Sequence, residues 1–115
     1  MSYSNQQLID LAQKDPQELI KIINHHYKTD IKTIALAVEV LGEEVDNEEI
    51  VLPIIRKLLK HVHVLIRESA MICIASFYAQ KRPPQDVIDR LKIILKSDPS
   101  HDLRDLANDT LRDLS

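Results

Sequence analysis

Glycine is nearly absent from this chain, and its scarcity limits the folds open to the sequence. Of the 115 residues only Gly42 is glycine, and five are proline. Because most other residues tolerate a helix interior, nearly every stretch between turn signals can be helical. Gly42 itself is expected at a helix end. A single glycine also excludes the P-loop and the GxGxxG and GxSxG motifs.

The apolar residues recur with the spacing of one helix face. Ile66, Ala70, Cys73, Ile74 and Phe77 follow one another in steps of three, four or one, which places them on a single stripe. Turn and capping signals divide the chain into expected helices at about 5–14, 15–27, 30–44, 47–61, 64–80, 84–96 and 101–114. The sequence therefore predicts an all-α fold.

Three helix starts carry clear capping signals. Ser4 is expected to cap the first helix, and Asp15 the second, where Pro16 stands in the first turn and Glu18 completes a capping box. Thr29 or Asp30 is expected to cap the third helix. The second helix is expected to continue to about Tyr27.

An internal repeat organises the second half of the chain. Arg67 precedes Arg104 by 37 positions, and the same interval separates Ala70 from Ala107 and Ile74 from Leu111. The segment 37–42 fits the same pattern one unit earlier. Helical hairpins with a period in the thirties are typical of an α-solenoid. We expect one domain, 1–115, with units at about 15–44, 47–80 and 84–114.

The repeated residues resemble the HEAT-repeat family. The middle unit matches with Leu52-Pro53-Ile54-Ile55, Leu58-Leu59, Ile66-Arg67, Ala70, Ile74 and Phe77, and the third with Ile94-Leu95, Asp98-Pro99-Ser100, Leu103-Arg104, Ala107, Leu111 and Leu114. The first unit has Ile34 in place of the arginine, and the middle unit has His61 in place of the turn aspartate. Armadillo-like repeats share this pattern, which does not separate the two families.

The resemblance implies a right-handed α-α superhelix of about three HEAT-like hairpins plus a short N-terminal helix. Pro53 would kink the first helix of its unit. Ala37, Ala70 and Ala107 would let paired helices approach closely.

The resemblance also implies a structural ladder of charged residues. Arg67 and Arg104 stand near helix starts, where the helix dipole disfavours a cation, so each is expected to have a carboxylate partner. Asp98 would pair with Arg67 across the boundary between two units.

In this family the second helix of each unit lines the concave face, which is the candidate binding surface. The residues off the core stripes there are Glu39, Glu43, Glu68, Met71, Ala75, Tyr78, Asp105, Asn108, Asp109 and Arg112. They would form an acidic rim around an apolar centre that suits a basic or amphipathic protein segment. Met71 and Tyr78 would anchor the partner, or alternatively pack between neighbouring units.

We therefore expect a non-enzymatic protein–protein interaction or adaptor module. A nucleic-acid binder is a second possibility, using the basic residues Arg56, Lys57, Lys60, His61, His63 and Arg67, extended by Lys81, Arg82, Arg90, Lys92 and Lys96. The net charge of −3 and the 3% of aromatic residues weigh against it. The sequence is also compatible with a small inhibitor or immunity protein, and with an enzyme subunit or chaperone similar to the HEAT-repeat phycobilin lyases.

No residue pattern indicates a metal, a cofactor or a nucleophile. The histidines His25, His26, His61, His63 and His101 form no recognisable ligand set, and the acidic turn at 43–49 lacks EF-hand spacing. Cys73 is expected in the core as a small apolar residue.

The expected location is cytoplasmic. A single cysteine fits a reducing compartment. The N-terminus has no signal-peptide pattern, and no apolar run is long enough to span a membrane. We expect a monomer.

Overall fold

The computed structural model of the chain describes residues 3–25 and 30–114. Within these ranges every regular element is a helix, so the predicted all-α class is confirmed there. The helices are α1 (Asn5–Lys14), α2 (Pro16–Asn24), α3 (Ile31–Glu44), α4 (Glu48–Leu58), α5 (Val64–Phe77), α6 (Gln85–Ser97) and α7 (His101–Leu114). None of these described helices is long and apolar enough to cross a membrane.

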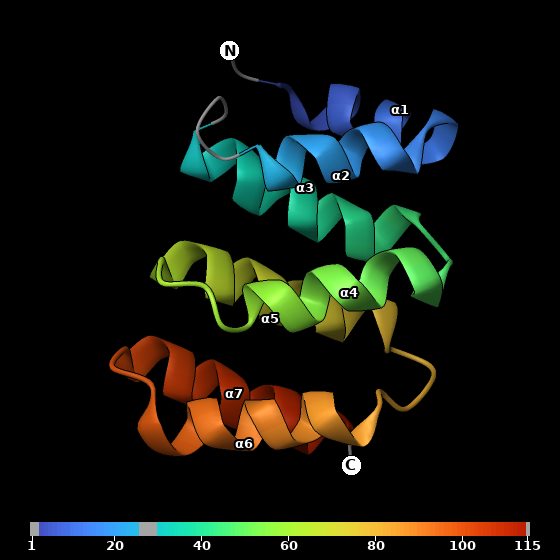
Figure 1. Cartoon of the computed structure of the whole chain (residues 1–115). Helices are drawn as coiled ribbons and strands as arrows, with labels where there is room; N and C mark the ends of the chain where they lie inside the picture. The colour runs from blue at the N-terminus through green and yellow to red at the C-terminus, as the bar shows by residue number, and fades with distance from the viewer. Residues whose placement is uncertain (1–2, 26–29, 115) are drawn as a thin grey trace.

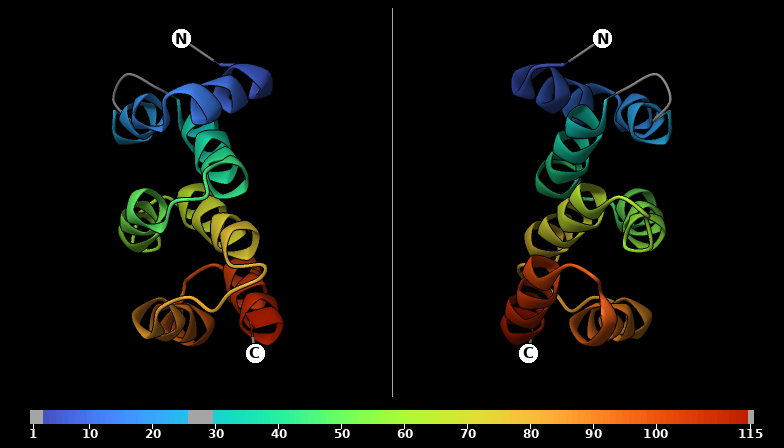
Figure 2. Two further views of the ribbon diagram at one scale, coloured as in Figure 1. Left: turned by 90° about the vertical axis from the view of Figure 1, so that its right-hand side faces the viewer. Right: turned by 90° about the vertical axis from the view of Figure 1, so that its left-hand side faces the viewer.

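The helices lie in two layers (Figures 1 and 2). One layer contains α2, α4 and α6, and the other contains α1, α3, α5 and α7. Within the second layer α1 packs against α3, α3 against α5, and α5 against α7. Consecutive helices also pair across the layers, as α2 with α3, α4 with α5, and α6 with α7. The described chain ends lie at opposite ends of this stack (Figure 1).

Most predicted helix starts are confirmed, and one cap is not. Ser4 forms a complete capping box with Gln7, and the side chain of Asp30 accepts a hydrogen bond from the Thr33 amide at 2.7 Å. Asp15 makes no side-chain cap, so the predicted capping box with Glu18 is wrong. Asp15 also ends α1, and its φ of −152° and ψ of 82° differ from those of the two capping residues.

Three helix ends differ from the prediction or lie outside the description. Helix α2 ends at Asn24 with His25 as its C-cap, so the expected continuation to about Tyr27 is wrong, and the alternative cap Thr29 falls outside the described residues. The structure ends α4 at Leu58 and α5 at Phe77, both three residues earlier than predicted. Pro53 is exposed inside a continuous α4, and the kink that we expected there remains a prediction.

Gly42 lies in the last turn of α3, which ends at Glu44, so its expected position near a helix end is confirmed, and it has no positive φ. A Cβ atom at this position would stand 2.8 Å from both the Cα and the carbonyl oxygen of Cys73. Real Cβ atoms essentially never approach backbone atoms so closely. The glycine is therefore needed for the close crossing of α3 and α5.

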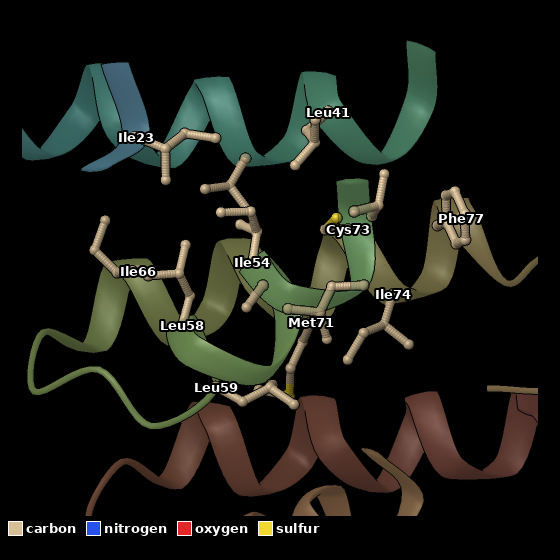
Figure 3. Packing of buried hydrophobic residues seen from close by; sticks show 14 of the residues in the cluster. Ile23, Leu41, Ile54, Leu58, Leu59, Ile66, Met71, Cys73, Ile74 and Phe77 are labelled. Carbon is tan, nitrogen blue, oxygen red and sulfur yellow. The ribbon is translucent and has the colours of Figure 1, made fainter. Parts of the chain in front are cut away.

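Buried apolar residues fill the space around the α3–α5 contact (Figure 3). Ala37, Ala70 and Ala107, the small positions that the repeat singled out, are all completely buried. Leu41, Cys73 and neighbouring apolar residues fill the space between α3 and α5 (Figure 3). The small side chains and Gly42 let the helices of the second layer pack against one another.

Candidate functional site

The predicted binding surface is only partly accessible. Six of its residues are exposed, namely Glu43, Ala75, Asp105, Asn108, Asp109 and Arg112. Glu39 and Glu68 are half-buried. The two expected anchors, Met71 and Tyr78, are buried, with exposed fractions of 0% and 2%. The prediction that Met71 and Tyr78 present an apolar centre to a partner is therefore wrong.

Met71 is buried because α5 is covered on several sides. This helix packs against α3, α4 and α7, and a helix with neighbours on three sides buries residues beyond its main apolar stripe. The Met71 side chain points toward α7 (Figure 3). The alternative interpretation, packing between neighbouring units, describes it correctly.

Tyr78 has a structural role at the end of α5. Its hydroxyl donates a hydrogen bond to Glu48 Oε2 at 2.7 Å, which links the C-terminus of α5 to the first turn of α4. Its ring meets Phe77 edge-on, with ring centres 4.9 Å apart. Burial and the Glu48 carboxylate raise the pKa of Tyr78. A buried tyrosine needs a partner for its hydroxyl, and Glu48 supplies it.

The accessible part of the layer that contains α3, α5 and α7 carries an acidic cluster, defined here as Glu39, Glu43 and Glu68. Glu39 and Glu43 lie one turn apart on α3, and Glu68 lies on the neighbouring α5. Burial, together with the charges of Glu43 and Glu68, raises the pKa of Glu39. The carboxylates of Glu43 and Glu68 thus disfavour the charge on Glu39.

Half-buried apolar residues flank the acidic cluster. Leu65 and Ile72 lie three residues before and four residues after Glu68, on the same face of α5. Leu36 stands in the same relation to Glu39 on α3. The accessible surface of α3 and α5 therefore alternates carboxylates with partly exposed aliphatic side chains.

Helix α7 adds further charges to the second-helix layer. Arg112 donates a hydrogen bond to Asp109 at 2.7 Å, and the imidazole of His101 lies 3.2 Å from the Asp105 carboxylate. Both contacts join side chains three or four positions apart on the exposed face of α7. Both contacts therefore lie within a single helix. The acidic cluster differs, because its carboxylates come from two helices, α3 and α5.

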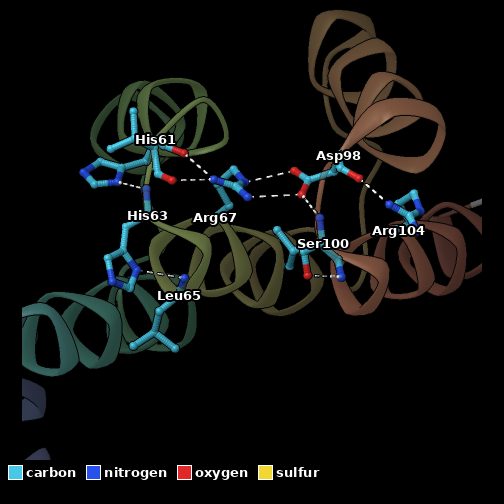
Figure 4. Close-up of polar contacts among 9 residues, drawn as sticks. His61, His63, Leu65, Arg67, Asp98, Ser100 and Arg104 are labelled. Carbon is cyan, nitrogen blue, oxygen red and sulfur yellow. Dashed lines mark hydrogen bonds and ion pairs between the residues drawn. The ribbon is translucent and has the colours of Figure 1, made fainter.

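The predicted pairing of Arg67 with Asp98 is confirmed (Figure 4). The guanidinium donates two hydrogen bonds to the carboxylate, at 2.9 and 3.1 Å. Arg67 Nη1 also donates to the carbonyls of His61 and Val62. The side chains of Arg67 and Asp98 are only 12% and 5% exposed. This pair joins the first turn of α5 to the turn before α7.

Within the described ranges Arg104 does not have the carboxylate partner that we expected. Its Nη1 donates instead to the backbone carbonyl of Asp98 (Figure 4). Arg67 makes the equivalent bond to the carbonyl of His61, also six residues earlier. The repeat thus preserves an arginine-to-turn bond, and Asp98 adds a carboxylate that reaches the preceding unit. His61, at the equivalent position, has no carboxylate to do so.

Structural roles are found for His61 and His63, in the turn before α5, and for Cys73 on α5. His61 Nδ1 accepts a hydrogen bond from the His63 amide, and His63 Nδ1 caps α5 by accepting one from the Leu65 amide (Figure 4). Among the described residues no three histidine, cysteine or acidic side chains are grouped to hold a metal; His26 lies outside them. Cys73 is fully buried, and burial raises its pKa to about 12.

The structure also shows a groove lined by Arg56, Lys60 and Arg90, which the sequence indicated only as members of a larger set of basic residues. It lies between α4 and α6, and we call it the α4–α6 groove. Arg56 closes one side through a bidentate pair with Asp86, at 2.8 and 3.0 Å. Lys60, Arg90 and Ile93 line its central part. Its walls come from residues about thirty positions apart, so no local motif could have marked it.

Comparison of the chain with protein-family models, with curated proteins and with solved structures gave no match. The candidate surfaces therefore rest on the residues and contacts described above.

Proposed function

We propose that the chain is a HEAT-like α-solenoid that acts as a non-enzymatic protein-interaction module. Three helical pairs stacked in two layers support the proposal. So do the equivalent bonds of Arg67 and Arg104, which recur with the 37-residue repeat. The right-handed superhelix, the unit boundaries and a monomeric state belong to the same proposal.

The proposed binding surface is the accessible face of α3 and α5. The observation that carries this assignment is the convergence of Glu39, Glu43 and Glu68 beside partly exposed aliphatic residues. Burial and the charges of Glu43 and Glu68 raise the pKa of Glu39, and a basic segment bound there would offset the repulsion between the carboxylates. Leu65 and Ile72 replace Met71 and Tyr78 as the apolar contacts, and an amphipathic helix offers both kinds of group on one face.

A synthetic amphipathic helix of alternating Lys and Leu turns is a suitable probe for this surface. We expect isothermal titration calorimetry to show binding that weakens several-fold in Glu68→Gln, since one of the three clustered carboxylates is lost. Glu49→Gln is the matched control, because Glu49 is an exposed glutamate on α4 in the other layer. Equal binding by the two variants would remove the α3–α5 face from consideration.

The apolar part of the surface needs a different substitution. Because Met71 is completely buried, Met71→Asp would unfold the chain and say nothing about binding. Ile72→Asp changes a half-buried neighbour on the accessible face. We expect it to abolish probe binding while circular dichroism keeps the helical signal. Retained binding in a folded Ile72→Asp would contradict the assignment.

The nucleic-acid alternative loses part of its support in the structure. Of the basic residues that it needs, Arg56 is paired with Asp86 and Arg67 with Asp98. Their charges are therefore largely compensated before any phosphate arrives, so the protein-interaction proposal is preferred.

A further inference from the structure

The α4–α6 groove consists of two adjoining hollows in the first-helix layer. One has a volume of about 280 Å³ and lies between Arg56 and Ile93. The other has a volume of about 260 Å³ and extends toward the Arg67–Asp98 pair. Lys60, Arg90 and Ile93 line both hollows, so these three side chains lie where the two hollows adjoin, in the middle of the groove.

Carboxylates pair with the arginines at the two ends of the groove, whereas in the middle one nitrogen of Arg90 has no hydrogen-bond partner among the described residues. Arg56 is bound by Asp86 at one end, and Arg67 by Asp98 at the other. Between them Arg90 Nε is buried and has no hydrogen-bond partner among the described residues. An unused buried donor is costly, and a charged one more so. Exposed Lys60 adds a second positive charge beside Arg90.

Apolar surface adjoins these two cations. Ile93 is 50% exposed, which is unusual for a large aliphatic side chain in this chain. Leu59 and Val87, both buried, form the apolar floor of the first hollow. A ligand in the groove would thus meet a cationic centre and an aliphatic wall within one small volume.

We propose that the α4–α6 groove is a second binding site, which takes an acidic peptide segment with an aliphatic side chain next to its carboxylate. The carboxylate would accept hydrogen bonds from Arg90 and Lys60, and the aliphatic group would cover Ile93. This site lies in the other layer from the acidic cluster and has the opposite charge preference. It does not depend on the function proposed for α3 and α5.

A nucleic acid fits the groove less well than a peptide. Asp86 and Asp89 line the first hollow together with the cations. A continuous phosphate backbone would meet these carboxylates, whereas a single peptide carboxylate can be placed between them and the free donors. The aliphatic wall also favours a ligand with an apolar side chain over a row of phosphates.

The proposal can be tested by NMR titration of the whole chain with a synthetic peptide of alternating Asp and Leu residues. We expect amide shifts on α4 and α6, and about tenfold or greater weakening in Arg90→Gln, as expected for loss of a charge-assisted bond. Lys60→Gln should also weaken binding, and it provides a second test should Arg90→Gln destabilise the fold. Lys92→Gln is the matched control, because Lys92 is an exposed cation on α6 that lines neither hollow.

Four results would overturn the proposal. One is the absence of peptide binding, and another is equal weakening by Lys92→Gln. A third is that a single-stranded oligonucleotide binds more tightly than the Asp-Leu peptide and that Arg90→Gln abolishes this binding, which would assign the groove to nucleic acid. The fourth is self-association of the unliganded chain in sedimentation, lost in Arg90→Gln, which would identify a second copy as the occupant. Stronger binding of the Asp-Leu peptide than of an Asn-Leu peptide supports the proposal.

Discussion

Arg67 shows how one side chain can join two helical pairs, α4 with α5 and α6 with α7. It uses its planar guanidinium to bind the carboxylate of Asp98 and two carbonyls of the preceding turn at once. Asp98 in turn accepts a hydrogen bond from the Ser100 amide at 2.9 Å. Such a network is satisfied only as a whole, because each removed partner leaves a buried polar group behind.

The free energy of unfolding should therefore depend strongly on Arg67. We expect Arg67→Ala to lower it by about 3 kcal/mol, the typical cost of leaving one member of a buried ion pair without its partner. The measurement is urea denaturation followed by circular dichroism.

Arg56→Ala is the matched control for this prediction. Arg56 has the same bidentate geometry with Asp86, but the two side chains are 47% and 57% exposed. We expect little change, since solvent screens an exposed pair. A loss in Arg56→Ala equal to that in Arg67→Ala would show that burial does not set the strength of the pair.

Glu39 makes stability depend on pH. Its pKa is raised in the folded chain by burial and by Glu43 and Glu68, so the folded state holds the proton at a pH where the unfolded state has lost it. This stabilising contribution is present at low pH and disappears as the pH rises through the folded-state pKa.

Glu39→Gln should reverse that loss. We expect the variant to be more stable than the parent at pH 7 by less than about 1 kcal/mol, given the partial exposure of the site. The difference should vanish below about pH 4, where glutamate is protonated in both states. Parallel denaturation of both proteins from pH 3.5 to 7 measures it. A variant that is less stable at pH 7 would contradict the repulsion described for the acidic cluster.

At the scale of whole elements, the structure gives a direct reason for the close crossing of α3 and α5. Gly42 faces the backbone of Cys73, with no room for a Cβ atom. The fully buried Ala37 and Ala70 lie on these same two helices. Small residues therefore set how closely the two helices approach.

This contact predicts the sign of a simple substitution. Gly42→Ala should stabilise an isolated helix by about 1 kcal/mol. In the folded chain we expect it to destabilise by about 1–3 kcal/mol, because the added methyl group forces α3 away from α5. The midpoint of thermal unfolding reports the sign.

The double variant Gly42→Ala/Cys73→Ala distinguishes backbone from side-chain crowding. A Cβ atom added at Gly42 would lie 2.8 Å from each of three atoms of Cys73, namely the Cα, the carbonyl oxygen and the Sγ. Since two of these atoms are backbone, removing the sulfur should restore little stability to the Gly42→Ala background. Full recovery would show that only the sulfur is in the way.

At the scale of the whole molecule, the stack has a centre and two ends. Helix α5 packs extensively against three helices, α3, α4 and α7. Helix α1 packs extensively against two, α2 and α3. In a stacked array each unit depends on its neighbours, so stability falls toward the ends.

Hydrogen exchange should follow this arrangement. We expect the amides of α5 to exchange most slowly and those of α1 to exchange faster, in native conditions followed by mass spectrometry. Leu8, fully buried on α1, should not be enough to protect its helix to the same degree. Uniform protection of α1 and α5 would indicate that the described chain unfolds as one cooperative unit.

The sequence by itself determined the helices and the residues that recur in them. The 3.6-residue spacing, the capping residues and the 37-position repeat are local or periodic, so they predicted the helix starts and the recurring small positions. The pairing of Arg67 with Asp98 was implied by the resemblance to HEAT repeats. The role of Asp15 was misjudged because a capping pattern does not specify the backbone angles at the end of the preceding helix.

Only the tertiary structure decided what is accessible. A helical stripe shows which residues share a face, but the number of neighbouring helices decides how much of the circumference is covered. Met71 and Tyr78 were predicted on the surface and are buried because α5 has neighbours on three sides and the Tyr78 hydroxyl finds Glu48 thirty positions away. The α4–α6 groove and the role of Gly42 arise in the same way, from contacts between segments that the sequence holds far apart.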